Sequence, residues 1–247
     1  MKQFDKNAEA YQRIRGKISY PESLYEALEK MSLNHRYALD IGCGNGVSTG
    51  RLTGRYQNIE GVDLGENLIV QARDNFPEIA FSVGKAEEFT ADKQYDLITS
   101  ATSFYWMDRE KVAAKLPTLL AEGGVFCAYK YDWPVVYGSL RDFIESELSQ
   151  HWCHHRDRRI VDYDNSAEIL TNAGGFADTS RRVFPNIVSL TPEEVALFFL
   201  STSYVTRYIE QSGHADYPEQ FLNKVLEIAT ESSVNVNFDI HAYVARN

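Results

Sequence analysis

The chain carries little that would tie it to nucleic acid or to a membrane. Lysine and arginine together number 25 against 35 aspartate and glutamate residues, so the formal net charge is −10. Proteins that bind long nucleic acids usually present a basic field, so we expect no nucleic-acid partner. No run of about eighteen apolar residues is present, so the sequence predicts no membrane-spanning helix.

Cysteine is also scarce, and no targeting signal is visible. The three cysteines are widely spaced, which argues against a disulfide framework and for a reducing compartment. The first residues lack the apolar stretch of a secretory signal. We therefore expect a cytoplasmic protein, monomeric or homodimeric, whose partner is a small molecule. The length of 247 residues suits a single domain with a proper core.

Short apolar runs alternate with helical patterns through the first half of the chain. Strands are predicted over 37–42, 59–64, 79–84, 95–101 and 124–131. Helices are predicted over 46–54, 66–75 and 108–121. Such alternation is typical of an α/β fold in which right-handed crossovers join parallel strands.

The second half follows a different rhythm. Residues 138–175 have a polar, helical pattern, and a sixth strand is predicted over 176–184. One helix is predicted over 191–211, where Thr191, Pro192 and Glu194 occupy the positions of a capping box. Another helix is expected over 217–232, and the alternating run at 234–244 predicts a final strand.

A glycine-rich loop follows the first predicted strand. Glycines at 42, 44 and 46 allow a tight turn, and the helix behind them would direct free N–H groups toward a ligand. Asp63 ends the second strand, 21 residues after Gly42, where a carboxylate can accept hydrogen bonds from both ribose hydroxyls. The loop and the acid together predict a nucleotide-type cofactor. The alternatives are a strand–helix turn without a ligand, and a helix cap at Asp63.

The loop spacing helps to choose the cofactor. A dinucleotide site expects Gly-x-Gly-x-x-Gly, whereas this chain has Gly-x-Gly-x-Gly with Asp40 directly before it. An acid there would repel a pyrophosphate but suit an ammonium or a sulfonium group. This favours S-adenosylmethionine over NAD.

The sequence resembles the class I S-adenosylmethionine-dependent methyltransferases over about residues 35–131. The match is carried by Leu39–Gly46, Gly61–Leu64, Gly84–Phe89, Tyr95–Ser100 and Glu122–Phe126. The resemblance implies a Rossmann-like, mostly parallel sheet of seven strands with helices on both faces, an antiparallel last strand and a helical lid.

The resemblance also implies which residues hold the cofactor. Asp40, Gly42 and Cys43 would surround the methionine moiety, with Cys43 present for its small size, and Gly44 would also bind the cofactor. Asp63 would hold the ribose, Leu64 would line the adenine, and Ala86 and Glu87 would meet the adenine edge. The family often has aspartate where this chain has Lys85, and a lysine cannot accept a hydrogen bond from the adenine amino group.

The segment after the fourth strand is expected to border the transferred methyl group. Ser100 and Tyr105 are predicted to line the cofactor site, and Trp106 is predicted to contact the substrate. The aromatic rings of Tyr105 and Trp106 would border the methyl group, since aromatic faces attract a sulfonium. The alternative is that these aromatics only pack the next helix. This segment is similar to a small-molecule subgroup related to trans-aconitate methyltransferase, which commonly has histidine where this chain has Tyr105.

By the same resemblance, one domain would span residues 1–247. It would comprise a helical lid (1–33), a cofactor-binding core (34–135), a helical insertion (136–175) and a last part with strand six, lid helices and the final strand (176–247). Tyr11 and Arg15 would close over the cofactor. Tyr204 and Arg207 share a helix face, and Arg207 is the candidate for gripping a substrate carboxylate. An ordinary amphipathic helix and a surface salt bridge are the competing interpretations.

The predicted activity is methyl transfer to a small molecule, most simply to a carboxylate oxygen. That reaction depends on alignment of the reactants and exclusion of water more than on a general base. Tyr105 is therefore the catalytic candidate, although no proton transfer is required of it. The histidines between His151 and His155 lack the spacing of a closed zinc site, so no metal is predicted. A catalytically silent cofactor-binding or scaffold protein, and an NAD-type oxidoreductase, are the alternatives.

Overall fold

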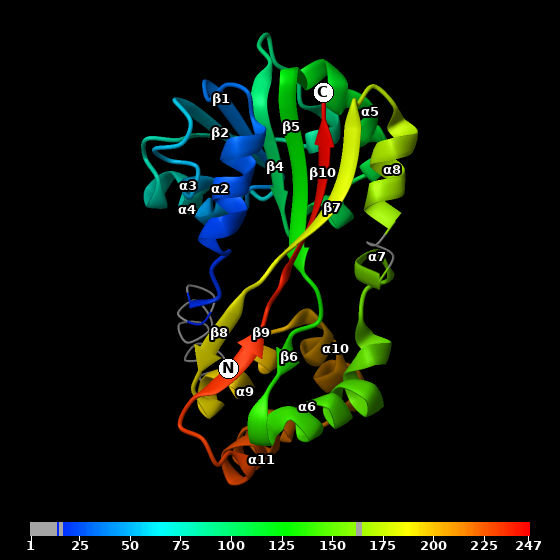
Figure 1. Cartoon of the computed structure of the whole chain (residues 1–247). Helices are drawn as coiled ribbons and strands as arrows, with labels where there is room; N and C mark the ends of the chain where they lie inside the picture. Colours follow the sequence, from blue (N-terminus) through cyan, green and yellow to red (C-terminus); the bar gives the residue numbers. More distant parts are fainter. Residues whose placement is uncertain (1–13, 15–16, 162–164) are drawn as a thin grey trace. The chain divides into compact units, whose positions relative to one another are not determined.

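The computed structural model describes residue 14, residues 17–161 and residues 165–247 (Figure 1). These residues form two compact units. Of the described residues, unit 2 holds 20–131, 165–184 and 240–247, and unit 1 holds 14, 17–19, 132–161 and 185–239. The predicted division into a lid, a core, an insertion and a last part stays a prediction, because both units draw on several of those segments.

Unit 2 is built on a seven-stranded sheet with strand order β3-β2-β1-β4-β5-β10-β7. The strands are β1 (Tyr37–Ile41), β2 (Asn58–Asp63), β3 (Ala80–Val83), β4 (Tyr95–Ala101), β5 (Leu120–Tyr131), β7 (Asp178–Phe184) and β10 (Ile240–Arg246). Strands β1 to β5 are parallel, whereas β10 runs antiparallel to β5 and β7. The predicted seven-stranded, mostly parallel sheet with an antiparallel last strand is confirmed.

Both faces of this sheet are covered. On one face, Leu97, Val125 and Cys127 join a core with Leu24 and Leu28. The intervening residues of β4 and β5, which point to the other face, are equally buried. The covering elements are α2 (Glu22–Met31), α3 (Val47–Gly50), α4 (Glu66–Asn75), α5 (Arg109–Leu119) and α8 (Ser166–Ala173), with short turns η1 (Ala86–Glu88) and η2 (Phe104–Trp106).

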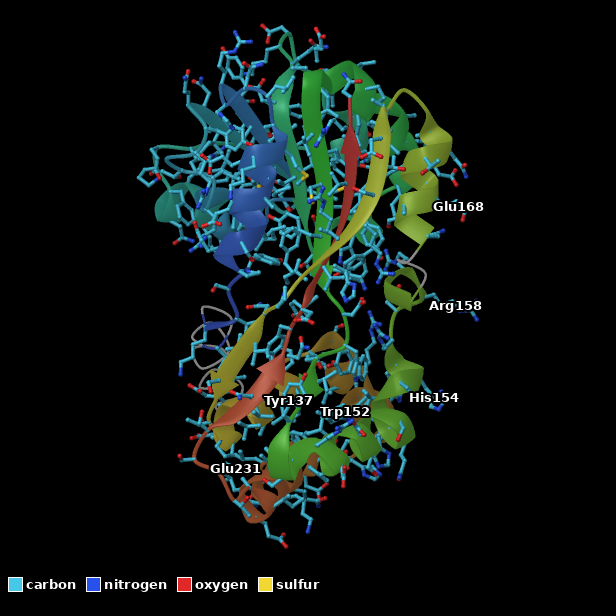
Figure 2. The ribbon with its side chains drawn as sticks, viewed as in Figure 1. Tyr137, Trp152, His154, Arg158, Glu168 and Glu231 are labelled. Carbon is cyan, nitrogen blue, oxygen red and sulfur yellow. The ribbon has the colours of Figure 1, made fainter. Side chains whose placement is uncertain are left out.

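Unit 1 combines helices with a small antiparallel sheet in the order β6-β9-β8. Its strands are β6 (Val135–Val136), β8 (Ile187–Leu190) and β9 (Val234–Asn237). Its helical elements are η3 (Gly138–Leu140), α6 (Arg141–Glu147), η4 (Leu148–Trp152), η5 (Cys153–His155), α7 (Arg158–Val161), α9 (Pro192–Leu200), α10 (Ser203–Ser212) and α11 (Tyr217–Ile228). Its core is aromatic: Trp152, which is labelled in Figure 2, is buried and stacks on Phe199. Phe198 packs edge-on against Phe238.

The prediction of one helix over 191–211 is wrong, because α9 ends at Leu200 and α10 begins at Ser203. The hydroxyls of Ser201 and Thr202 donate to the carbonyls of Phe198 and Phe199, and the Thr202 backbone is extended. Such local side-chain bonds compete with the helical ladder and end it there. The predicted capping box at the start of α9 is confirmed.

The single final strand predicted over 234–244 is also wrong. Strand β9 belongs to the small sheet of unit 1, and β10 belongs to the large sheet of unit 2. Between them, Phe238 is buried against Phe198, and the Asp239 carboxylate accepts a hydrogen bond from the Asn186 backbone. Alternation alone indicates an extended chain and does not say which sheet each half joins.

No helix in the part of the chain that the structure describes is both long and apolar enough to cross a lipid bilayer. All three cysteines are free, with Cys43 and Cys127 buried and Cys153 exposed.

Candidate functional site

A cavity of about 530 Å³ opens in unit 2 where the parallel strands end. Its walls come from the segments that follow β1, β2, β3 and β4, the edge at which open α/β sheets bind ligands. The lining residues are Gly42, Asp63, Leu64, Gly84, Lys85, Ala86, Glu87, Glu88, Ser103, Trp106, Met107, Asp108 and Lys111. The structure therefore brings together six of the residues that the sequence singled out: Gly42, Asp63, Leu64, Ala86, Glu87 and Trp106.

The glycine loop needs glycine at its first position. Gly42 has a φ of +69°, and a Cβ placed there would lie 2.5 Å from the Ser103 hydroxyl oxygen and 2.7 Å from the Met107 methyl carbon. The Gly42 and Cys43 N–H groups donate to the Val62 carbonyl at 2.7 and 3.1 Å, which ties the loop to β2. The loop backbone therefore faces the cavity without a side chain in the way.

Asp63 joins the two loops at the cavity mouth. Its Oδ2 accepts a hydrogen bond from the Gly44 N–H at 2.9 Å, and its Oδ1 accepts one from the Gly65 N–H at 2.7 Å. An ionised carboxylate has about four acceptor positions, so further ones remain for the hydroxyls of a ligand. The backbone thus holds the predicted ribose anchor in a fixed orientation at the cavity.

Two large apolar side chains at the cavity are unusually exposed. Leu64 is 66% exposed and Trp106 is 44% exposed, although both lie among lining residues. The Trp106 ring leans on the Tyr105 ring at 5.1 Å between centroids. A flat, partly apolar ligand that covered these side chains would remove their surface from water, which is favourable.

The charged lining residues are mainly acidic. Asp63, Glu87, Glu88 and Asp108 supply four carboxylates, whereas Lys85 and Lys111 supply two ammonium groups. Both lysines are already paired, Lys85 with Glu88 at 3.1 Å and Lys111 with Asp108 at 2.7 Å. Glu87 accepts a hydrogen bond from the Asp108 N–H at 2.7 Å, which ties η1 to the start of α5. The cavity therefore suits a cationic ligand better than a polyanion.

Asp40 lies behind the glycine loop and is absent from the cavity lining. The residue is fully buried, and its carboxylate accepts hydrogen bonds from the hydroxyls of Thr49 at 2.6 Å and Thr99 at 2.9 Å. Burial raises the pKa of Asp40 to about 6, although both threonine hydroxyls oppose the shift. Asp40 therefore fastens β1 to α3 and β4, and its selection of a cationic donor stays a prediction.

The other residues predicted around the cofactor also lie outside the lining. Cys43 is buried among apolar side chains of α4 and β3, and burial holds the pKa of its thiol above the usual range. Ser100 is fully buried and shares a hydrogen bond with Ser103 at 2.8 Å, while Gly44 reaches the site through Asp63. Tyr105 is 7% exposed and supports Trp106. Their predicted roles stay predictions.

The sequence reasoning missed Ser103, Met107 and Lys111. Ser103 follows Thr102, whose φ of +53° is unusual for a β-branched residue. The Thr102 N–H donates to the Tyr129 carbonyl at 2.7 Å, and its hydroxyl shares a 2.6 Å hydrogen bond with the Tyr20 hydroxyl. These contacts hold a strained turn that directs Ser103 to the cavity. In the sequence, the signal that could have identified the missed residues was the position of this segment after the end of β4.

The predicted substrate residues of the late helix lie in unit 1. Tyr204 stacks on Trp133 with ring centroids 4.9 Å apart. Arg207 pairs with Asp157 at 3.6 Å and donates to the His155 carbonyl at 3.2 Å, so its guanidinium already has protein partners. Tyr11 and Arg15, the predicted cofactor clamp, lie outside the described residues.

The histidine-containing segment packs against α10. The rings of His151 and His155 contact Tyr208 at centroid distances of 5.2 and 5.5 Å. In the described ranges, no group of three or more metal-ligating side chains converges.

Comparison with known proteins connects this geometry to one family. The family described as "Methyltransferase domain" matches residues 38–124. Trans-aconitate 2-methyltransferase of Methylobacterium radiotolerans is 31% identical over 132 residues, which are 52% of this chain and 50% of that protein. Malonyl-[acyl-carrier protein] O-methyltransferase of Acetivibrio thermocellus is 32% identical over 125 residues, 49% of this chain and 44% of that protein. The chain thus spans about half the length of these curated relatives.

A solved structure extends the likeness to nearly the whole fold. A protein of Anaeromyxobacter dehalogenans, described as a proposed type II methyltransferase, aligns with a TM-score of 0.75 over 92% of this chain and 96% of its own. The two sequences are 23% identical, so the alignment shows a shared fold.

Proposed function

We propose that the chain uses S-adenosylmethionine to methylate a small organic acid, a proposal supported by the match of residues 38–124 to a methyltransferase domain. One observation carries the cofactor assignment. Asp63 is fixed by two backbone N–H groups at the mouth of the cavity and keeps acceptor positions free for a ribose.

The described residues fit S-adenosylmethionine in size and chemistry. The cavity volume of about 530 Å³ lies within the range of about 300–1,000 Å³ that is usual for small-molecule sites. Leu64 and Trp106 offer apolar surface for a flat base, and four lining carboxylates against two paired lysines favour a cationic donor over a pyrophosphate. This charge balance supports the cofactor choice without a direct role for Asp40.

When bound, S-adenosylmethionine would supply an activated methyl group. This chain's residues then have to hold and orient the reactants. Gly42 lets the backbone approach closely, Asp63 fixes the ribose end, and Ser103 and Trp106 line the wall that follows β4. Alignment of nucleophile and methyl carbon in a dry site accounts for most of the rate gain in such a displacement.

An organic acid is the substrate class that fits the lining and the relatives together. No histidine is present among the lining residues of the described cavity, and a carboxylate nucleophile needs no general base. Trans-aconitate and the malonyl group, for which the two relatives are named, both carry carboxylates. Turnover of an acid is therefore the simplest activity that this site could support.

Calorimetric titration with S-adenosylhomocysteine tests the cofactor assignment. We expect saturable binding that Asp63→Asn weakens by about ten- to a hundredfold, because a charged acceptor contributes about 1.5–3 kcal/mol to a hydrogen-bonded site. Asp74→Asn, an exposed carboxylate on α4, is the matched control and should bind like the parent protein. Absence of S-adenosylhomocysteine binding, or binding of NAD in its place, would overturn the proposal.

Turnover tests the substrate class. S-adenosylhomocysteine release would be followed with trans-aconitate, malonate and citrate, and with their methyl esters as blocked controls. We expect turnover with a free acid and a rate that changes little between about pH 6.5 and 8.5, since carboxylates are ionised throughout that range. Cofactor binding without turnover of any acid would favour the silent binding protein. A rate that rises steeply with pH would point to a phenol or amine acceptor.

A further inference from the structure

Arg156 in unit 1 is a cation that lies over an aromatic ring. Its guanidinium carbon lies 4.5 Å from the centroid of the Trp133 ring, and the side chain is half-buried. Within the ranges that the structure describes, no carboxylate lies within ion-pair distance of it. A half-buried guanidinium on an aromatic face is desolvated on one side, so an anion that contacts its open edge would be bound strongly.

Two other arginines of unit 1, Arg159 and Arg207, differ from Arg156 because both pair with the carboxylate of Asp157. Arg159 pairs with Asp157 at 2.9 Å, and Arg207 pairs with the same carboxylate at 3.6 Å. These contacts hold the pKa of Asp157 well below its usual range, at about 2, with the Arg159 hydrogen bonds as the main cause. Asp157 is the only acid between His151 and Arg159, so this segment is locally basic in a chain of net charge −10.

Trp133 also carries a hydrogen-bond donor that has no partner among the described residues. Its indole Nε1 is enclosed from solvent and has no acceptor in the described part of the chain. A buried N–H without a partner is costly and calls for an explanation, such as a ligand that the site is built to hold. A carboxylate, which only accepts hydrogen bonds, could satisfy both this N–H and the Arg156 fork.

The aromatic platform beneath Arg156 is anchored in the core of unit 1. Trp133 stacks on Tyr204 at 4.9 Å, and Tyr204 in turn contacts the fully buried Trp152 at 6.1 Å. The Trp152 indole donates to the Tyr217 hydroxyl at 3.0 Å. Because packing fixes these rings, the guanidinium rests on a preorganised support, which reduces the entropy lost when a ligand binds.

We propose that Arg156, supported by Trp133, forms a binding site in unit 1 for the carboxylate of a small organic acid. The class of ligand rests on the proposed function, whereas the contacts that define the site all lie within unit 1. It assigns the carboxylate to Arg156 in place of Arg207, whose guanidinium already contacts Asp157 and the His155 carbonyl.

The indole N–H resonance of Trp133 provides a direct test. The chain has three tryptophans, so the indole region of a ¹⁵N spectrum of the full chain is simple, and Trp133→Phe assigns the signal. Trans-aconitate and malonate are the probes, malonamide is the uncharged counterpart, and sodium chloride controls for ionic strength. We expect the Trp133 signal to shift saturably with the two acids and not with malonamide or salt.

Variants of neighbouring arginines separate the site from general charge. Arg156→Gln should weaken acid binding at least about tenfold, and Arg156→Lys should weaken it less, because lysine keeps the charge but not the planar fork. Arg158→Gln is the matched control: Arg158 is exposed and extends outward from α7, so acid binding should be unchanged (Figure 2). Unfolding midpoints of all variants would confirm that each is folded.

Three outcomes would overturn the proposal: no saturable shift with either acid, an equal shift with chloride, or an unchanged affinity in folded Arg156→Gln. Titration of the same variants with S-adenosylhomocysteine keeps this result apart from the proposed function. Normal binding of S-adenosylhomocysteine with no acid response would reject the Arg156 site and leave the cofactor assignment intact.

Discussion

The carboxylate of Asp40 shows how one buried charge can serve structure at the expense of stability. It is enclosed in the sheet, and hydrogen bonds from the hydroxyls of Thr49 and Thr99 partly offset the loss of water. Its pKa in the folded protein is about 6, well above the value of about 3.9 for a free aspartate. The folded protein therefore binds a proton more readily than the unfolded chain between those pH values.

This difference sets the sign of a pH effect on stability. For a group whose folded pKa is raised, the stabilising contribution is present below about pH 4 and is lost as the pH rises through about 6. We expect Asp40→Asn to lack this loss, so its stability relative to the parent should improve by on the order of 3 kcal/mol from pH 4 to pH 7.5. Urea unfolding at both pH values measures it, and a stability difference independent of pH would contradict the buried-charge explanation.

Gly42 is a second residue at which one atom, an added Cβ, is expected to change both stability and cofactor binding. A Cβ there would combine a left-handed backbone with contacts of 2.5 and 2.7 Å to Ser103 and Met107. We expect Gly42→Ala to cost about 1–2 kcal/mol from the backbone and about 1–3 kcal/mol from overpacking, and to weaken S-adenosylhomocysteine binding. Urea unfolding and calorimetry measure the two effects.

Gly54→Ala is the control for this substitution. Gly54 has a φ of +80°, but a Cβ there would meet no atom within 4 Å. It should show the backbone cost alone and keep the parent's cofactor affinity. Equal losses of stability in the two variants would show that the contacts with Ser103 and Met107 do not matter.

At the scale of one element, the start of α9 rests on a reciprocal cap. The Thr191 hydroxyl accepts a hydrogen bond from the Glu194 N–H at 3.2 Å, and the Glu194 carboxylate accepts one from the Thr191 N–H at 3.0 Å. Thr191→Ala should therefore lower the free energy of unfolding by about 1 kcal/mol, and Thr191→Ser should retain most of it. Chemical denaturation measures both, and a Ser variant as weak as Ala would show that the methyl group, not the hydroxyl, matters.

At the scale of the whole molecule, the chain passes between the units at five points, after Ser19, Tyr131, Val161, Phe184 and Asp239. Neither unit is continuous in sequence, so we expect both to unfold in one cooperative transition. Ligand bound in unit 2 should then raise the whole transition, by about 2.7 kcal/mol at a hundredfold excess of S-adenosylhomocysteine over its Kd. Calorimetric scanning checks this, and a second transition that ignores the ligand would show that the units unfold separately.

The strands β1 to β4 of unit 2, the glycine loop and the acid at 63 could be predicted from local patterns. Strand–helix alternation, the glycines at 42, 44 and 46 and the acid at 63 are each set by short-range chemistry: side-chain period, positive φ and the position at a strand end. The predicted ranges of β1 to β4 accordingly lie within one or two residues of the observed ones. Local signals of this kind need no knowledge of distant contacts.

Side-chain direction and partner choice could not be predicted in this way. Asp40 and Asp63 both end apolar runs, but only the fold turns Asp63 to the cavity and Asp40 into the sheet. The pairing of Arg207 with Asp157 likewise depends on segments about 50 residues apart. The order of residues cannot reveal these contacts, because each depends on which elements pack together.

The sequence by itself determined the alternating strands and helices of the sheet, the glycine turn and the position of the acid that ends β2, because these follow from neighbours along the chain. Tertiary structure alone decided that the last alternating run divides between two sheets, that Ser103 and Met107 reach the cavity, and that Arg156 lies over the Trp133 ring while Arg207 contacts Asp157. Those outcomes depend on register, packing and competition for a shared carboxylate, all of which arise only once distant segments meet.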